Sequence, residues 1–185
     1  MLGRQVGGDN SHLVRHRILR PNGTEVRLRG HKEAVISAEF SADGKTLVTV
    51  SEDGTIRAWR SDTWSEMWSA PAATHSVDVI AAADSDIFGV LQSHTLQLRG
   101  RDGEVLGESE LPDATCVAIS GSQHGLIAAA TKGADVQLKT FAGVNRASIR
   151  LGFAVKAMAF NGPQHLVVVD GAGAISRFEI PTESA

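Results

Sequence analysis

The chain has 185 residues and a mass of 19.6 kDa, which is enough for one folded domain with a sizeable apolar core. Its residues are 42% hydrophobic and 21% charged, with 19 Gly and 5 Pro, a composition that excludes disordered and collagen-like chains. A net charge of −3 excludes a polycation that binds nucleic acid by bulk charge.

The sequence contains no segment of the kind that enters or crosses a membrane as a helix. No apolar run approaches the roughly 20 residues that a membrane span needs, and residues 1–9 lack the apolar core of a signal peptide. The single Cys116 excludes an internal disulfide framework and a thiolate cluster for zinc. We therefore expect a cytoplasmic protein with no membrane partner.

Short apolar segments recur along the chain at intervals of 39 or 40 residues. One series of strand-like runs begins at Leu47, Ile87, Leu126 and Leu166, and a second contains Ile56, Leu96, Val136 and Ile175. Further runs precede and follow each pair, and turns rich in Gly, Asp, Asn and Ser separate them. Four short antiparallel strands in each unit of about 40 residues are typical of a blade of a β-propeller. The predicted fold is therefore all-β, with almost no helix.

Taken in chain order, these units predict about four and a half blades. Residues 1–30 form a partial blade with strands at 2–7, 12–19 and 25–29, and residues 181–185 form a tail. Whole blades are expected at 31–70, 71–111 and 112–151, followed by a partial blade at 152–180. A closed ring would pair the last three strands with Val26–Leu28 and leave residues 2–19 redundant. We favour an open arc, an incomplete ring whose free edge needs a partner.

One of the units carries a specific motif. It combines Gly30-His31, the turn Phe40-Ser41-Ala42-Asp43-Gly44, the turn Ser51-Glu52-Asp53-Gly54-Thr55, and Trp59 near the end of the third strand. These elements in this order closely resemble a WD repeat. By motif the resemblance covers residues 28–60, and by period it covers the whole chain.

The resemblance implies that four residues form a hydrogen-bonded network that locks the blade: His31, Ser51, Asp53 and Trp59. Buried imidazole, hydroxyl and indole groups each need a partner, and a satisfied network rigidifies its surroundings. The other units depart from the pattern. The Trp position reads Arg99, Lys139 and Phe178, the Asp position reads Ser93, Gly133 and Ala172, and the Trp-Asp dipeptide is absent.

Three chemical alternatives are weaker. Ser51, His31 and Asp53 have the residue types of a nucleophilic triad, but the chain lacks the Gly-x-Ser-x-Gly elbow, and the repeat explains the same residues. The scattered histidines have no metal-ligand spacing on a credible helix, so we expect neither metal nor cofactor. Cys116 lies in an apolar strand, where a small buried thiol is more common than a reactive one.

Basic residues gather near the N-terminus, at Arg15, Arg17, Arg27 and Arg29. We favour solvated outer strands for this basic face over an acidic protein surface. A nucleic-acid surface is the weakest alternative, because this stretch offers no aromatic side chain for base stacking. Trp64 and Trp68 are expected to fill gaps between blades.

The function that we expect is that of a non-enzymatic scaffold for protein–protein interaction, of WD-repeat type. By their position on turns in the best repeat, Lys32, Glu33 and Glu52 are the candidate residues for binding a protein partner. The main alternative is an assembly element that completes a propeller with another chain or with a second copy. An enzyme or a nucleic-acid binder is less favoured.

Overall fold

The computed structural model describes residues 16–19, 25–72, 77–81, 87–121, 125–162 and 164–180, with the backbone alone at 16–19, 27 and 77–81. Every regular element in these ranges is a β-strand, and none of them is a helix that could cross a membrane. Two strands form an N-terminal hairpin, β1 (His16–Leu19) and β2 (Glu25–Leu28).

The remaining strands form four antiparallel sheets, which we call the first, second, third and last blades. The first contains β3 (Val35–Phe40), β4 (Thr46–Ser51), β5 (Thr55–Arg60) and β6 (Glu66–Pro71). The second contains β7 (Val77–Ala81), β8 (Ile87–Gln92), β9 (Thr95–Gly100) and β10 (Val105–Glu110). The third contains β11 (Ala114–Ile119), β12 (Leu126–Thr131), β13 (Asp135–Thr140) and β14 (Asn145–Arg150), and the last contains β15 (Val155–Phe160), β16 (His165–Asp170) and β17 (Ile175–Glu179).

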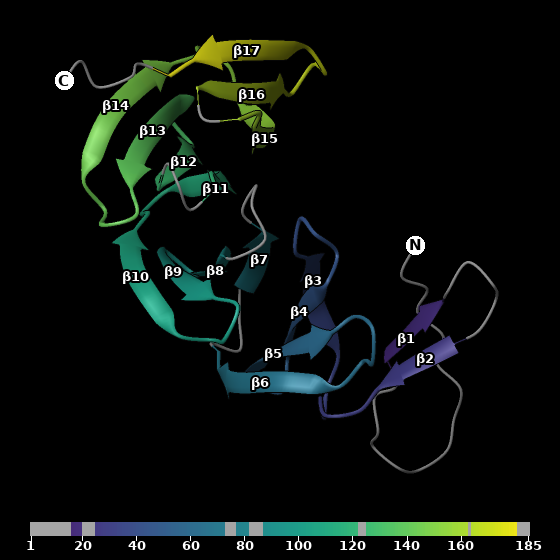
Figure 1. Ribbon diagram of the computed structural model, residues 1–185. Helices are drawn as coiled ribbons and strands as arrows, with labels where there is room; N and C mark the ends of the chain where they lie inside the picture. Colours follow the sequence, from purple (N-terminus) through teal and green to yellow (C-terminus); the bar gives the residue numbers. More distant parts are fainter. Residues whose placement is uncertain are drawn as a thin grey trace.

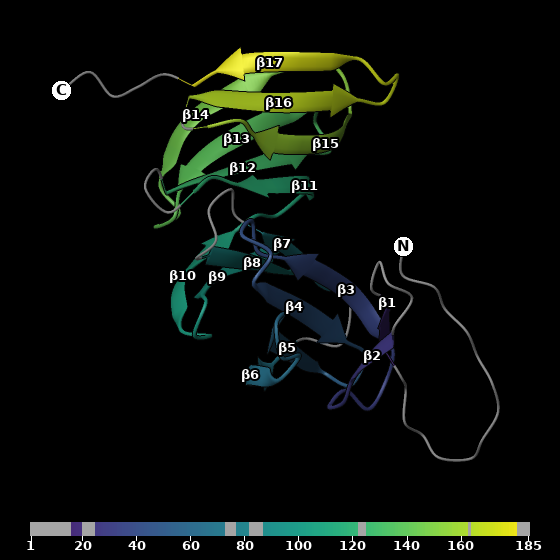
Figure 2. The same ribbon diagram turned by 45° about the vertical axis from the view of Figure 1, so that its right-hand side comes forward.

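The blades follow one another around an open arc (Figure 1), and the view in Figure 2 shows the strands of each sheet side by side. The predicted all-β fold of four-stranded antiparallel blades is confirmed, as is the incomplete ring. The expected strand at residues 2–7 lies outside the described residues, and of the expected strand at 12–19 only β1 is described.

The first, third and last blades share a detail of strand register. The pairing of the first two strands shifts by one residue at Val35/Ser37, at Ala114/Cys116 and at Val155/Ala157. Such a shift is a β-bulge, which bends and twists the strand locally. Its recurrence at corresponding positions indicates that these three blades are copies of one structural unit.

The apolar core lies between neighbouring blades, because alternate residues of each strand point to opposite faces of the sheet. Between the first two blades, Val48, Val50, Ile56 and Ala58 pack in one cluster with Phe88 and Val90. Equivalent clusters lie between the second and third blades and between the third and last blades. Each interface therefore joins two sheet faces. One is the face of a blade that points toward the following blade, which we call its forward face, and the other is the face of the following blade that points back.

The forward face of the last blade differs from the others. Ile175 occupies the position that Ile56, Leu96 and Val136 hold in earlier blades, as the strand registers show. Those three side chains are 0% exposed, whereas Ile175 is 73% exposed. In the described part of the chain nothing covers Ile175, so the arc ends in an open blade face.

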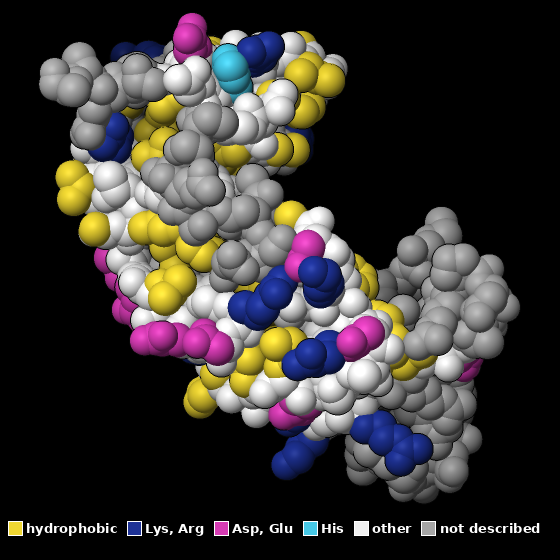
Figure 3. Space-filling model, in the orientation of Figure 1, with side chains coloured by type: hydrophobic (Ala, Val, Ile, Leu, Met, Phe, Trp, Pro, Cys, Tyr) yellow, Lys and Arg dark blue, Asp and Glu magenta, His cyan; other side chains and the backbone are white. Residues whose placement is uncertain are grey.

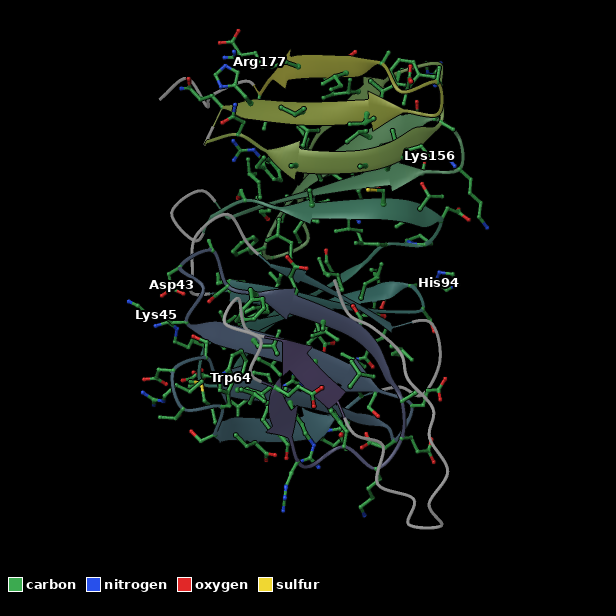
Figure 4. All side chains as sticks on the ribbon, turned by 90° about the vertical axis from the view of Figure 1, so that its right-hand side faces the viewer. Asp43, Lys45, Trp64, His94, Lys156 and Arg177 are labelled. Atoms are coloured by element: carbon green, nitrogen blue, oxygen red, sulfur yellow. The ribbon has the colours of Figure 1, made fainter. Side chains whose placement is uncertain are left out.

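Polar contacts at the edge of the sheets join the first two blades. The Asp43 carboxylate accepts a hydrogen bond from the Arg101 guanidinium at 2.6 Å, and the Trp68 indole donates to the Arg101 carbonyl at 2.7 Å. Trp68 also packs on the apolar cluster between these blades, as expected of a ring that fills a gap. Asp43, Lys45 and Trp64 lie at one end of the blades, and His94 lies at the other (Figure 4).

Candidate functional site

The candidate site is built around His31, in the loop that leads from β2 into β3. The imidazole is 3% exposed and has polar partners on both ring nitrogens. Its Nε2 lies 2.8 Å from the Thr49 hydroxyl on β4, and its Nδ1 lies 3.2 Å from the Asp53 carboxylate in the turn between β4 and β5. These two contacts connect the loop to strand β4 and to the turn between β4 and β5.

Trp59 on β5 completes the network from the opposite side. Its indole N–H donates to the Thr49 hydroxyl at 2.9 Å, and its ring meets the His31 ring edge-on with centroids 6.1 Å apart. The side chain is 1% exposed and packs with Leu28 and Leu47. Because a buried indole N–H without a partner is costly, the Thr49 hydroxyl is a structural requirement of Trp59.

Ser51 has a different place from the one that the motif suggested. The hydroxyl that joins Trp59 to His31 belongs to Thr49, two residues earlier on β4. Ser51 is 0% exposed, donates to the Glu33 carbonyl at 3.0 Å and accepts from the Asp53 backbone N–H at 3.1 Å. Its hydroxyl therefore fastens the loop and the turn to each other and is not presented as a nucleophile.

Asp53 is the polar centre of the turn. Its carboxylate accepts from the Thr55 hydroxyl at 2.6 Å, from the Thr55 N–H at 2.9 Å and from the Lys32 N–H at 2.7 Å. Burial alone raises the pKa of this carboxyl, but the hydrogen bonds from Thr55, Lys32 and His31 outweigh it and hold the pKa of Asp53 at about 2. Asp53 is accordingly a carboxylate at neutral pH.

The three candidate contact residues surround this network. Lys32, Glu33 and Glu52 are all exposed, although the backbones of Lys32 and Glu33 bond Asp53 and Ser51. The Glu52 N–H donates to the Ala34 carbonyl at 2.9 Å. Their side chains thus stand in solvent on a backbone that the buried network holds in place.

The other blades carry different chemistry at the Trp position. Arg99 is 8% exposed, donates to the Gly103 carbonyl at 2.8 Å and lies 6.0 Å from the centre of the Trp68 ring. Burial lowers the pKa of Arg99, an effect that the charge of Glu108 opposes. The Lys139 ammonium donates to the Glu110 carbonyl at 2.7 Å, and Phe178 packs on the last apolar cluster.

The Asp position is equally changed in the later blades. Ser93, Gly133 and Ala172 all lie in exposed turns between the second and third strands of their blades. None of these three residues has a carboxylate that could bind a neighbouring loop. Among the described blades, only the first contains the complete network.

The basic face that the sequence suggested is described only in part. Arg15 lies outside the described residues, and Arg17 on β1 is paired in register with Arg27 on β2. Arg29 follows β2 and is exposed. On the face of the molecule shown in Figure 3, Lys and Arg side chains lie beside Asp and Glu over the first two blades rather than forming a field of one sign.

The remaining candidates have structural surroundings. Trp64 packs on the cluster of Leu28, Leu47 and Trp59 and meets Phe40 edge-on at 6.3 Å, and Cys116 is partly buried against the core beside the last blade. His165 lies 2.7 Å from the Arg177 guanidinium. Among the residues that the structure describes, no three His, Cys, Asp or Glu side chains are grouped to hold a metal ion.

Comparison with known proteins identifies the repeat and the fold. Residues 23–60 match the WD40 family model, described as "WD domain, G-beta repeat". No curated protein matches the chain in sequence. Among solved structures, the β-propeller domain of Cps50 (Swd1) from Myceliophteria thermophila is similar, with a TM-score of 0.70 at 13% identity over 91% of this chain and 63% of that chain.

Two further structures are similar over most of the chain. Sqt1 from Saccharomyces cerevisiae has a TM-score of 0.68 at 17% identity, over 92% of this chain and 54% of that chain. The computationally designed Ika4 protein has a TM-score of 0.63 at 17% identity, over 83% of this chain and 96% of that chain. The chain thus spans 54% to 63% of the two natural structures and nearly all of the designed one.

Proposed function

From a chain that carries a WD40 repeat at residues 23–60 and has the fold of a WD40 propeller, we propose a non-enzymatic scaffold that binds another protein through the turns of its first blade. WD40 propellers are generally protein-interaction scaffolds, which supports the class. The buried network of His31, Thr49, Asp53 and Trp59 is the observation that carries the choice of site. It anchors the backbone that presents Lys32, Glu33 and Glu52 to solvent.

A rigid presenting backbone favours binding for a physical reason. Association costs free energy when loops and side chains must be ordered, and a loop that is already held in place avoids part of that cost. Lys32 and the two glutamates place charges of both signs on one small surface. Charged side chains at the edge of an interface mainly govern selectivity and the rate of association. The proposed partner is therefore a protein surface that also has charges of both signs.

Quantitative affinity capture tests this proposal. The wild-type chain is compared with the double variant Lys32→Ala/Glu52→Ala and with the control Lys45→Ala. Lys45 is exposed and lies at the end of the blades opposite His94 (Figure 4). The turn that contains His94 corresponds to the turn that contains Glu52, so Lys45 lies away from the proposed contact site. We expect proteins that the wild-type chain captures reproducibly to be lost with the double variant and retained with Lys45→Ala. Unchanged capture by the double variant would reject this contact site.

The non-enzymatic part of the proposal has its own test. The Ser51 hydroxyl is buried and donates to a carbonyl, so a serine-reactive phosphonate should leave it unlabelled. Labelling of Ser51 in the folded protein would contradict the proposal and revive a hydrolytic role. The cytoplasmic location expected from the sequence is part of the same proposal, and microscopy of the tagged full-length protein in its source cells tests it.

A second candidate function is assembly, and the exposed face of the last blade favours it. Ile175 is 73% exposed where its counterparts are buried between blades, and exposed apolar surface of this kind marks interfaces. Another chain or a second copy placed on this face would continue the arc. Native mass measurement should then show a complex that Ile175→Asp dissociates. A monomer at all concentrations, with Ile175→Asp no more soluble than wild type, would argue against it.

A further inference from the structure

The third blade contains a pocket of about 360 Å³ at the turn that corresponds to the Asp53 turn of the first blade. The loop before β11, the end of β12 and the turn into β13 surround it. The lining residues are Leu111, Pro112, Asp113, Ala114, Ala129, Thr131, Lys132, Gly133 and Gln137. This pocket lies outside the candidate contact residues of the first blade.

The pocket occupies the place where the first blade has its network. Strand registers pair Thr49 with Arg57 and Ala129 with Gln137, so Ala129 is the counterpart of Thr49. By the same correspondence Gly133 replaces Asp53, which removes the carboxylate. Leu111 is the buried residue of the loop before β11, as His31 is of the loop before β3. Because Ala129 and Gly133 are smaller than Thr49 and Asp53 and form no such network, this space stays open.

The floor of the pocket is apolar and its wall carries one available amide. Leu111 and Ala129 lie beneath the floor and are each 2% exposed, and Pro112 and Ala114 supply its accessible carbon surface. The Gln137 position is engaged in the first two blades, where Arg57 pairs with Glu66 and the Gln97 amide donates to Glu108 at 2.7 Å. Within the described ranges the Gln137 side chain has no such partner.

The rim carries charges of both signs, because Lys132 and Asp113 both line the pocket and both are exposed. Lys132 is exposed, and its ammonium forms no ion pair with any residue that the structure describes. Its backbone N–H donates to the Asp113 carbonyl at 3.2 Å, which fixes the turn beside the loop. Apolar floor, free amide and free ammonium therefore adjoin one another within a single turn and loop.

We propose that this pocket binds an extended peptide segment of a partner protein, with one aliphatic side chain on the apolar floor and an acidic residue beside it. Gln137 bonds the peptide backbone, and Lys132 pairs with the acidic side chain. The proposal deepens the scaffold function and rests on it, because it names the chemistry that a partner must present. It places this contact in the third blade, apart from Lys32, Glu33 and Glu52.

The defined probe is the blocked peptide acetyl-Gly-Leu-Asp-Gly-amide, observed by its effect on the methyl resonances of Ala114 and Ala129. We expect saturable shifts at these methyl groups in the millimolar range that a single small contact provides, about 1 mM. Peptides with Ala for Leu or Lys for Asp should bind more weakly. The acid 4-methylpentanoate has the same tail and a carboxylate without a peptide backbone; equal binding of this acid would overturn the peptide proposal.

Two matched glycine variants locate the binding. A Cβ added to Gly133 meets nothing closer than 3.6 Å, and one added to Gly171, in the corresponding turn of the last blade, meets nothing closer than 3.9 Å. Because neither Cβ meets a close contact and both glycines are exposed, we expect both Phe variants to fold. Gly133→Phe should weaken peptide binding by about tenfold or more, and Gly171→Phe should leave it unchanged. Equal effects of the two variants, or no shift at the two methyl groups in the wild type, would overturn the site.

A charge exchange tests the role of Lys132. Lys132→Glu should weaken the Leu-Asp peptide and strengthen the Leu-Lys peptide by about two- to fivefold each, the size expected of a partly exposed ion pair. Identical affinities in both proteins would overturn the acidic preference. Lys32→Ala/Glu52→Ala should bind the peptide as wild type does, so failure of the first-blade contact site and failure of this pocket give different results.

Discussion

The first and third blades have the same backbone and different buried chemistry. In the first, the Gly54 N–H donates to the Ser51 carbonyl at 3.2 Å, and in the third the Ala134 N–H donates to the Thr131 carbonyl at 3.1 Å. The carbonyls of Gly54 and Ala134 likewise accept from Ala72 and Leu151. The turn is thus formed both with the hydrogen-bonded network and without it.

The two blades share the apolar side chains that pack between neighbouring blades. Ile56 and Ala58 in the first blade correspond to Val136 and Leu138 in the third, and all four are buried. Burial of the three larger side chains, Ile56, Val136 and Leu138, contributes about 1.5–3 kcal/mol each. We infer that packing between blades specifies the fold, and that the network specifies how the loop before β3 is held.

The largest expected difference between the two blades concerns Trp59 and its counterpart Lys139. Trp59→Ala removes a buried ring and leaves the Thr49 hydroxyl without its donor, so we expect a loss of about 3–5 kcal/mol in the free energy of unfolding. Lys139→Ala should cost less than about 1 kcal/mol, because Lys139 is only partly buried. Urea titration measures both; equal losses would show that the network adds nothing to the first blade.

Removal of the bridging hydroxyl isolates the polar part of the network. Thr49→Val keeps the shape of the side chain but leaves the Trp59 indole and the His31 ring each short of a partner, at an expected cost of about 2–3 kcal/mol. Thr49→Ser should recover most of that loss. Thr131→Val in the third blade has no such pair to disrupt and should change stability by less than about 0.5 kcal/mol. A loss of equal size at both threonines would remove the distinction between the blades.

Acidification should weaken the first blade through Asp53. Its pKa is about 2 in the folded chain, below the ordinary value of 3.8, so the folded state binds this proton less readily than the unfolded state. The stabilisation is therefore complete above about pH 4 and lost as the pH falls toward 2, and it amounts to about 2 kcal/mol. Asp53→Asn lacks this dependence. The stability difference between wild type and Asp53→Asn should shrink by that amount between pH 5 and pH 2, and a constant difference would contradict the assignment.

The sequence predicted the strand order well because both of its signals are local. Alternation within Leu96-Gln97-Leu98 and the Asp-Gly turns repeat with the blade, and each specifies a hairpin without reference to distant residues. The same periodicity predicted the incomplete ring, since the number of units follows from the length. Packing between blades then needs only that alternate residues be apolar.

The members of the network were harder to predict. Thr49 and Ser51 lie two apart on β4 and share a face of the sheet, so alternation does not distinguish them. The reach of the Trp59 indole decides between them, and that distance depends on how β4 and β5 are paired. The available signal was a hydroxyl on the same sheet face as Trp59 and two residues from Leu47, its partner in register on β4. The pocket of the third blade was also missed, because Gly133 appeared only as a departure from the motif and Ala129 was not singled out.

The smallest expected effect concerns the residue that follows Asp53 in one turn and Gly133 in the other. Gly54 has a φ of 75° and Ala134 a φ of 61°, so both blades require the left-handed conformation here. A side chain in that conformation costs about 1–2 kcal/mol, and glycine gives back part of the difference through its greater freedom in the unfolded chain. Gly54→Ala should therefore destabilise the protein and Ala134→Gly should stabilise it, by about 1 kcal/mol each. Thermal unfolding of the two variants measures both; shifts of the same sign would show that the two turns differ in backbone as well as in side chains.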